Sequence, residues 1–448
     1  MHPRRHATAI VAAMVAVTGV GVSSAAALPT KQADPQPGGS VLPRAVPAAG
    51  TFYPTTPVRL LGTPDTGYAV DPASGATVAV AGRSGLPSSG ISAVVLNVVA
   101  VAGAADAALS FGAPGAPAAA PLLVAPAGAS RSALLTLPIT ASGSVQLTTS
   151  SAATVSVDLV GFYAADDTVL GSQGLSGGYQ PVDVTRLFGT DSTHPLAAGA
   201  RQLVGVDLGA AATPHTTALL VRATATGAAA PGTLAVGPVG PVGAAASVPS
   251  VAFAGGATSS NLAVVPATLD PDGRLGVAVT NASSGATSVT LDLVGFYDDG
   301  ALGPNLRFRP LPQTRVVDTS TSVGAAALQP GRRTTVTPSD AVVGDSTFAL
   351  VGVVTATSSG GPAGIEVDTP EATTASDVDV VAGTTTVPVQ AQVGAARGLG
   401  LRTRDGSAPT GITIDVTGSF EAYPPVTNPA ARGWVPAVPS WQVAATPR

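Results

Sequence analysis

Cysteine is absent from the 448-residue chain. This absence excludes a disulfide framework, a thiolate metal site and a cysteine nucleophile. Lys31 is the only lysine, and Glu366, Glu371 and Glu421 are the only glutamates. Helices built from Glu, Lys and Leu are therefore not available, and the abundance of Ala, Val, Thr, Ser, Gly and Pro favours short β-strands joined by turns.

Charge and long apolar runs are also scarce. Charged residues make up 10 % of the chain, and the formal net charge is −5. A sparse, mildly acidic surface argues against nucleic acid and anionic lipid as partners, since both require concentrated Lys or Arg. Beyond the N-terminus the strongest apolar run is Ile91–Ala102, which is too short to span a bilayer and contains Asn97. No residue pattern indicates a cofactor, and we expect none.

The N-terminus has the pattern of an export signal. Arg4 and Arg5 precede an apolar run that starts near Ala7, and three alanines end at Ala27. This order is typical of a secretory signal peptide, and we expect residues 1–27 to be removed. A membrane anchor is the alternative, but the run is shorter than the ~20 residues that cross a bilayer. Twin-arginine export remains open beside general secretion. The mature chain is expected outside the cell, where association with the envelope is open.

One motif recurs three times along the chain. TVSVDLVGFY at Thr154–Tyr163 returns as SVTLDLVGFY at Ser288–Tyr297 and as ITIDVTGSF at Ile412–Phe420, and each has a matching opening upstream, near Phe52, Tyr179 and Phe308. Repeats of this length indicate tandem domains. The predicted division is a disordered Pro/Gly-rich leader at 28–50, repeats at 51–163, 178–297 and 307–423, linkers at 164–177 and 298–306, and a Pro/Trp tail at 424–448.

Within each repeat the apolar segments are short and separated by turn residues. Ile91–Val101 reads as a fully buried strand, and Val155, Val157 and Leu159 alternate with polar residues as in a half-buried strand. Leu134–Ile139 and Ser144–Thr149 flank a turn with Gly143 and are interpreted as a hairpin. These features predict an all-β protein of three tandem antiparallel β-sandwich domains, either jelly-roll or Ig-like.

The openings and closings together resemble a β-repeat of secreted and surface proteins of actinobacteria. That repeat opens with an aromatic residue and proline followed by R-[LV]-[LV]-D-T-R-x-G, and it closes with V-D-V-x-G-[WY]-F. The resemblance implies no catalytic activity for the repeat itself. The Asp-Thr step of the opening is kept only at Asp318, because Gly62 and Gly189 replace the acid, and Asn97 of the middle strand corresponds to Arg222 and Gly352.

An arginine in each opening is matched by an aspartate in each closing strand. The pairs are Arg59 with Asp158, Arg186 with Asp292, and Arg315 with Asp415. Because a planar guanidinium binds a carboxylate through two hydrogen bonds, we expect structural ion pairs that fasten the two ends of each repeat.

Trp434 and Trp441, both in the tail, are the only tryptophans. They could stack on a sugar, since carbohydrate sites commonly use exposed aromatic rings, or they could dock the tail on the third repeat, which we favour. Cell-wall glycan and another surface protein are the open partners.

Other candidate sites have simpler explanations. Glu366, Asp368 and Glu371 could in principle form the carboxylate pair of a glycoside hydrolase, but alternating acids on an exposed strand explain them. Asp270 and Asp272 resemble part of a calcium loop, although a plain turn is favoured. The sequence thus predicts a secreted, non-catalytic structural or adhesive protein, with a carbohydrate-binding module as the alternative and a glycoside hydrolase as a remote one.

Overall fold

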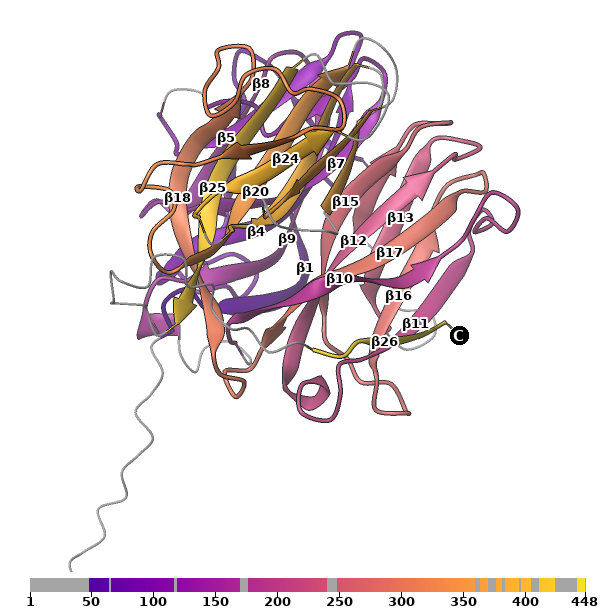
Figure 1. Cartoon of the computed structure of the whole chain (residues 1–448). Helices are drawn as coiled ribbons and strands as arrows, with labels where there is room; N and C mark the ends of the chain where they lie inside the picture. Colours follow the sequence, from indigo (N-terminus) through magenta and orange to yellow (C-terminus); the bar gives the residue numbers. More distant parts are fainter. Residues whose placement is uncertain are drawn as a thin grey trace, which may run out of the picture. The chain divides into compact units, whose positions relative to one another are not determined.

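The computed structural model describes residues 48–63, 66–116, 119–169, 176–239, 248–358, 363–369, 376–380, 383–394, 396–403, 411–423 and 441–447. In this part of the chain nearly all regular structure is antiparallel β-sheet (Figure 1). Its two helices, η1 (Asp167–Val169) and η2 (Thr213–His215), are single turns, and no described helix has the length and apolarity needed to cross a membrane. The predicted signal peptide lies outside the described residues.

The first repeat forms two sheets. The main sheet has the order β1-β9-β4-β7, with β2 also paired to β9, and the second sheet has the order β3-β8-β5-β6. The strands are β1 (Phe52–Leu61), β2 (Tyr68–Val70), β3 (Ala76–Ala79), β4 (Ile91–Ala102), β5 (Ala107–Gly112), β6 (Leu123–Ala125), β7 (Ser130–Pro138), β8 (Ser144–Thr149) and β9 (Ala153–Ala164).

The second repeat follows the same plan, with the main sheet β10-β17-β12-β15 and the second sheet β11-β16-β13-β14. Its second sheet gains a fifth strand, β26, from the C-terminal tail. The strands are β10 (Tyr179–Gly189), β11 (Arg201–Asp207), β12 (Thr216–Thr226), β13 (Gly232–Pro238), β14 (Pro249–Phe253), β15 (Ser259–Pro266), β16 (Leu275–Asn281), β17 (Ser288–Asp298) and β26 (Ala444–Pro447).

The third repeat has the main sheet β18-β25-β20-β23 and the second sheet β19-β24-β21-β22. The strands are β18 (Asn305–Asp318), β19 (Arg333–Val336), β20 (Thr347–Ser358), β21 (Ala363–Asp368), β22 (Ser376–Val380), β23 (Gly383–Gln392), β24 (Leu399–Thr403) and β25 (Gly411–Tyr423).

The strand order identifies each repeat as a jelly roll. With β2 and β26 set aside, every main sheet takes the first, eighth, third and sixth strands of its repeat, and every second sheet takes the second, seventh, fourth and fifth. This interleaving of eight strands is the double-sheet jelly roll; an Ig sandwich divides its strands differently. The all-β antiparallel prediction is confirmed, and the topology decides between its two alternatives.

The same topology corrects the predicted hairpin. β7 pairs with β4 in the main sheet, whereas β8 pairs with β3 and β5 in the second sheet. The turn at Gly143, whose φ is 65°, therefore carries the chain from one sheet to the other. Turn residues between two apolar segments show that the chain reverses, but they do not show whether the segments pair.

The end of the predicted disordered leader also differs. Ala48 is buried and its N–H donates to the Asp167 carboxylate at 2.6 Å. Gly50 donates to the Ala164 carbonyl oxygen and accepts from the Phe308 N–H, so it connects the first repeat with the third. Residues 48–50 thus belong to the fold, because their backbone groups complete the edges of two repeats; residues 28–47 lie outside the described part.

Three separate tandem domains are not confirmed. The described residues all fall in one compact unit, Val46–Arg448. Through a bridge between Tyr179 and Leu306, the main sheets of the second and third repeats join into one eight-stranded sheet. Each jelly roll has its own core, and a fourth core is shared by residues from all three main sheets. The outer face of each main sheet is therefore covered, which the half-buried pattern of the closing strand did not predict.

Candidate functional site at the junction of the repeats

All three predicted ion pairs form. Arg59 Nε and Nη2 donate to the two carboxylate oxygens of Asp158 at 2.5 and 3.1 Å, and Arg315 does the same to Asp415 at 3.1 and 2.9 Å. Arg186 makes a short bond from Nε to Asp292. Each pair joins residues that lie opposite each other on the first and last strands of a main sheet.

The hydrogen bonds around these pairs explain why the first repeat can lack the aspartate that the third repeat keeps in its opening motif. In the third repeat the retained Asp318 accepts a further hydrogen bond from Arg315, donated by Nη1 at 3.1 Å. In the first repeat the Thr63 carbonyl accepts from Arg59 instead, and Gly62 has a φ of 88°. A backbone oxygen thus replaces the acid in the first repeat. Hydrogen bonds from Ser320 are the main reason that the pKa of Asp318 lies below its usual value.

The correspondence of Asn97 with Gly352 is wrong by one residue. Asn97 lies opposite Asp158 and Arg222 lies opposite Asp292, but the residue opposite Asp415 is Val353. The register shifts after Val351, as it does after Val95 in the first repeat. A sequence pattern of period two cannot locate such a bulge.

Asn97 connects the first repeat with the second. Its Nδ2 donates to the Pro249 carbonyl at 2.8 Å, and its Oδ1 accepts from Asn261 at 3.4 Å. Asn261 also accepts from the Leu134 N–H, and Ser132 exchanges hydrogen bonds with the backbone of β14. These buried polar contacts fix β7 against the second repeat, because an unpaired donor or acceptor there would be costly.

Six aromatic rings form the centre of the shared core. They are Phe52, Tyr163, Tyr179, Tyr297, Phe308 and Phe420, and we call them the aromatic ring cluster. Each repeat contributes one ring from its first strand and one from its last, at residues that lie opposite each other in the sheet.

The contacts within the aromatic ring cluster are cyclic. The first-strand ring of each repeat packs on the last-strand ring of the next, with centroid distances of 4.1 Å for Phe52 to Tyr297, 4.6 Å for Tyr179 to Phe420 and 4.2 Å for Phe308 to Tyr163. The third repeat thereby closes back on the first. Offset and tilted aromatic pairs at such distances stabilise a core beyond their buried area.

A glycine in each closing strand makes room for these rings. A Cβ atom at Gly161 would lie 2.2 Å from the Phe52 ring, and one at Gly418 would lie 2.1 Å from the Phe308 ring. At Gly295 the clash would be with the Tyr179 hydroxyl, at 2.1 Å. The recurring glycine is therefore required by the close approach of an aromatic ring to the backbone, beside a register shift in the sheet.

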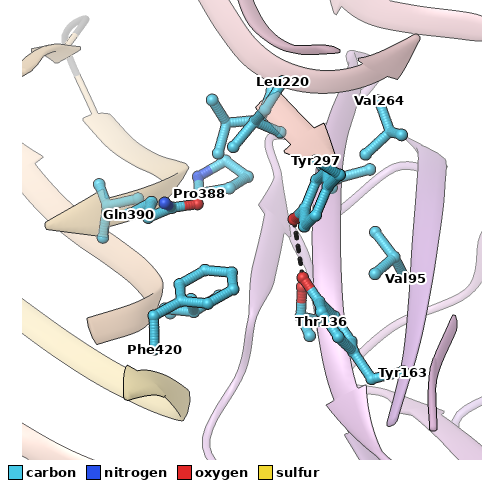
Figure 2. A pocket seen from close by; sticks show the side chains of 14 residues that line it. Val95, Thr136, Tyr163, Leu220, Val264, Tyr297, Pro388, Gln390 and Phe420 are labelled. Carbon is cyan, nitrogen blue, oxygen red and sulfur yellow. Dashed lines mark hydrogen bonds between the residues drawn. The ribbon is translucent and has the colours of Figure 1, made fainter. Parts of the chain in front are cut away.

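A small cavity borders the aromatic ring cluster (Figure 2). Tyr163, Tyr297 and Phe420 line it together with side chains from the sixth strand of every repeat, among them Thr136 and Gln390. The hydroxyl groups of Tyr163 and Tyr297 point toward each other and are hydrogen-bonded at 2.7 Å. The space that a water-sized sphere can reach is about 20 Å³, which holds one water molecule and is far below the volume of an ordinary ligand pocket.

The tyrosines of this cavity are unsuited to acid–base chemistry. Burial raises the pKa of Tyr163 well above its usual value, and proximity to Tyr297 adds to the effect. Burial likewise raises the pKa of Tyr297, the other tyrosine of the cavity, and that of Tyr179 in the aromatic ring cluster. The phenols therefore stay protonated and serve as hydrogen-bonding and packing groups, so the cavity offers hydroxyl groups but no base to activate them.

Trp441 docks on the second repeat, not on the third as expected. Its ring lies 5.5 Å from that of Phe296 in an edge-to-face arrangement, and it packs against the core of the second repeat. The Trp441 side chain is half-buried at this contact. Trp434 lies outside the described residues. The prediction chose the third repeat because it directly precedes the tail in the chain. No sequence motif indicated that the tail pairs with a strand of the second repeat.

The acidic candidates are engaged in structure. Glu366 accepts two hydrogen bonds from Arg402, both at 2.8 Å, and lies 3.9 Å from Arg333. Burial raises the pKa of Asp368, and Glu371 is outside the described residues. Asp270 caps its own turn by accepting from the Asp272 and Arg274 N–H groups. Among the described residues, no group of three or more His, Asp or Glu side chains is arranged to hold a metal ion.

Comparisons with known proteins add little. No protein-family model matches the chain, and no curated protein matches it. One similar solved structure is described as the triple jelly roll fold and turret assembly of an archaeal virus; it is 9 % identical over 84 % of this chain and 90 % of that one, with a TM-score of 0.16. Another, from Sulfolobus Turreted Icosahedral Virus, is 9 % identical over 80 % and 85 %, with a TM-score of 0.15. Similarity at this level supports no conclusion about function.

Proposed function

We propose that the protein is a non-catalytic structural or adhesive protein that is exported and acts at the cell envelope. One observation carries the proposal: the residues shared by the three repeats all serve the fold. The arginine–aspartate pairs fasten first strands to last strands. The glycines and the aromatic ring cluster hold the repeats together.

A repeated binding or catalytic site would leave a different pattern. Its shared polar groups would converge on a cavity with room for a ligand. Here the cavity bordered by all three repeats has room for about one water molecule. Repetition of the structural residues instead suits a scaffold of three linked jelly rolls. The export signal predicted at Arg4 to Ala27 and the resemblance to an actinobacterial surface repeat support the proposed location.

The test separates location from binding. The full chain, expressed with its N-terminus, should appear outside the cell with residues 1–27 removed, as shown by mass spectrometry of the mature N-terminus. Purified protein is then sedimented with purified cell wall. Recovery in the pellet supports the adhesive role, and recovery in the supernatant supports a scaffold that makes no wall contact. Retention of the uncleaved protein inside the cell, or release of sugar from a chromogenic glycoside, would contradict the proposal.

A further inference from the structure

The C-terminal tail adds a strand to the edge of the second repeat (Figure 1). β26 runs antiparallel to β11, with Val204, Gly205 and Val206 opposite Pro447, Thr446 and Ala445. β11 is seven residues long, whereas the equivalent strands β3 and β19 have four residues each, and neither is joined by such a strand in the described part of the chain. A long strand edge is a template for pairing, and the tail covers the longest of these three equivalent edges.

Side chains of the tail alternate between the core of the second repeat and solvent, as they do in an extended peptide bound at a sheet edge. Trp441, Val443 and Ala445 pack against the core of the second repeat. The residues between them, Gln442 and Ala444, are exposed. On the outer side Arg274 Nη1 donates to Thr446 Oγ1 at 2.6 Å. Backbone pairing with pockets for alternate side chains is how sheet edges recognise extended peptides.

The composition of the second repeat explains why Trp441 fits there. In the first repeat Tyr53 stacks on Phe162, at 5.0 Å. The residue opposite Phe296 in the second repeat is Gln180, whose amide is committed to Asp298 at 2.9 Å. Phe296 therefore has no aromatic neighbour from its own first strand, and Trp441 supplies one. In the third repeat Ser419 takes the place of the phenylalanine and offers no such surface.

We propose that the β11 edge and Phe296 form a strand-acceptor groove for residues 441–447, and that the tail of a second copy can fill it. Seventeen residues separate Tyr423 from Trp441, five of them prolines. An extended Pro-rich segment of that length spans roughly 50 Å, which is enough to reach a neighbouring molecule. When two copies exchange their tails, each tail makes in the other copy the contacts that it makes in its own. The tail of a second copy must compete with the molecule's own tethered tail, whose effective concentration at the groove is on the order of millimolar. Densely packed copies at a cell surface would favour it, and to that extent the proposal rests on the proposed location.

The groove is tested on the full folded chain. A protease site is placed between Asn428 and Arg432, the purified protein is cut, and circular dichroism verifies that it stays folded. The released tail should co-elute with the protein and should be displaced by a labelled peptide of residues 437–448 that binds one to one. The same peptide with Trp441→Ala should bind at least tenfold more weakly, since an aromatic anchor carries much of the affinity of such a site. Loss of the tail without peptide binding, or equal binding of both peptides, would refute the groove.

Exchange between copies is tested by analytical ultracentrifugation of the uncut chain from about 10 µM to about 1 mM, the range that brackets the effective concentration. We expect dimers to accumulate toward the upper end, and a Trp441→Ala chain to remain monomeric. If the wild-type chain stays monomeric throughout, or if both chains dimerise equally, the second-copy part of the proposal is wrong even where peptide binding succeeds. Neither readout depends on export or on cell-wall binding, so the two proposals can fail separately.

Discussion

Replacing Gly418 by alanine should destabilise the whole unit. The added Cβ would lie 2.1 and 2.4 Å from two atoms of the Phe308 ring and 3.1 Å from a backbone oxygen. The ring cannot retreat freely, because it packs on Tyr163 at 4.2 Å and on Phe420 at 5.7 Å. Overpacking of this kind costs about 1–3 kcal/mol, and loss of an aromatic contact adds about 0.5–1.5 kcal/mol. We therefore expect a loss of about 3 kcal/mol in the free energy of unfolding.

Gly411→Ala is a matched control in the same strand. Gly411 and Gly418 both lie in β25, neither has a positive φ, and a Cβ at Gly411 would meet nothing within 4 Å. This substitution should leave stability unchanged or raise it by up to about 1 kcal/mol, since alanine restricts the unfolded chain. Urea unfolding of the two variants, followed by circular dichroism, gives the comparison directly.

A double variant isolates the cause. Phe308→Ala removes the ring that meets the new Cβ, and by itself it should cost about 3–5 kcal/mol. If the clash with Phe308 is the reason for the loss, adding Gly418→Ala to this background should cost less than about 1 kcal/mol more, because contacting residues are strongly coupled. An unchanged cost in that background would refute the reasoning, as would equal destabilisation by Gly411→Ala and Gly418→Ala.

Three further predictions concern the polar groups of the unit. Asp158→Asn should lower the free energy of unfolding by about 2–3 kcal/mol, and Asp292→Asn should lower it by about 1 kcal/mol or less. The reason is that solvent weakens the more exposed ion pair: the Arg59 side chain is 22 % exposed, whereas that of Arg186 is 57 % exposed. Equal urea midpoints for the two variants would contradict this order. Tyr297→Phe should cost about 1 kcal/mol, and adding Tyr163→Phe should cost little more, because the pair of buried hydroxyls is then removed together; additive losses in a double-mutant cycle would argue against the bond. Burial raises the pKa of Asp298, so the folded chain binds this proton more tightly than the unfolded one, and the resulting stability is present below pH 3.8 and is lost as pH rises through the folded pKa. As the pH falls from 7 to 4, the urea midpoint of the wild type should therefore rise relative to that of Asp298→Asn. A difference between the two midpoints that stays constant over this range would show that Asp298 does not titrate in this way.

The sequence by itself determined the all-β class, the threefold repetition and the three ion pairs. Each of these follows from local patterns: apolar alternation of period two, recurring motifs, and an arginine and an aspartate at matched positions of first and last strands. These patterns persist because every copy must satisfy the same backbone and side-chain geometry. The recurring motifs also contain Phe52, Tyr163 and Tyr297, but they do not show which rings contact one another.

Tertiary structure alone decided what covers each face. Period two shows that Asp158 and Val157 lie on opposite sides of a strand, but it does not show that a neighbouring repeat buries the outer side. The cyclic stacking of Phe308 on Tyr163 and the docking of Trp441 on Phe296 join residues 145 positions apart in both cases. Such contacts depend on the relative placement of whole sheets, which is set by the sum of many weak packing terms rather than by any local motif.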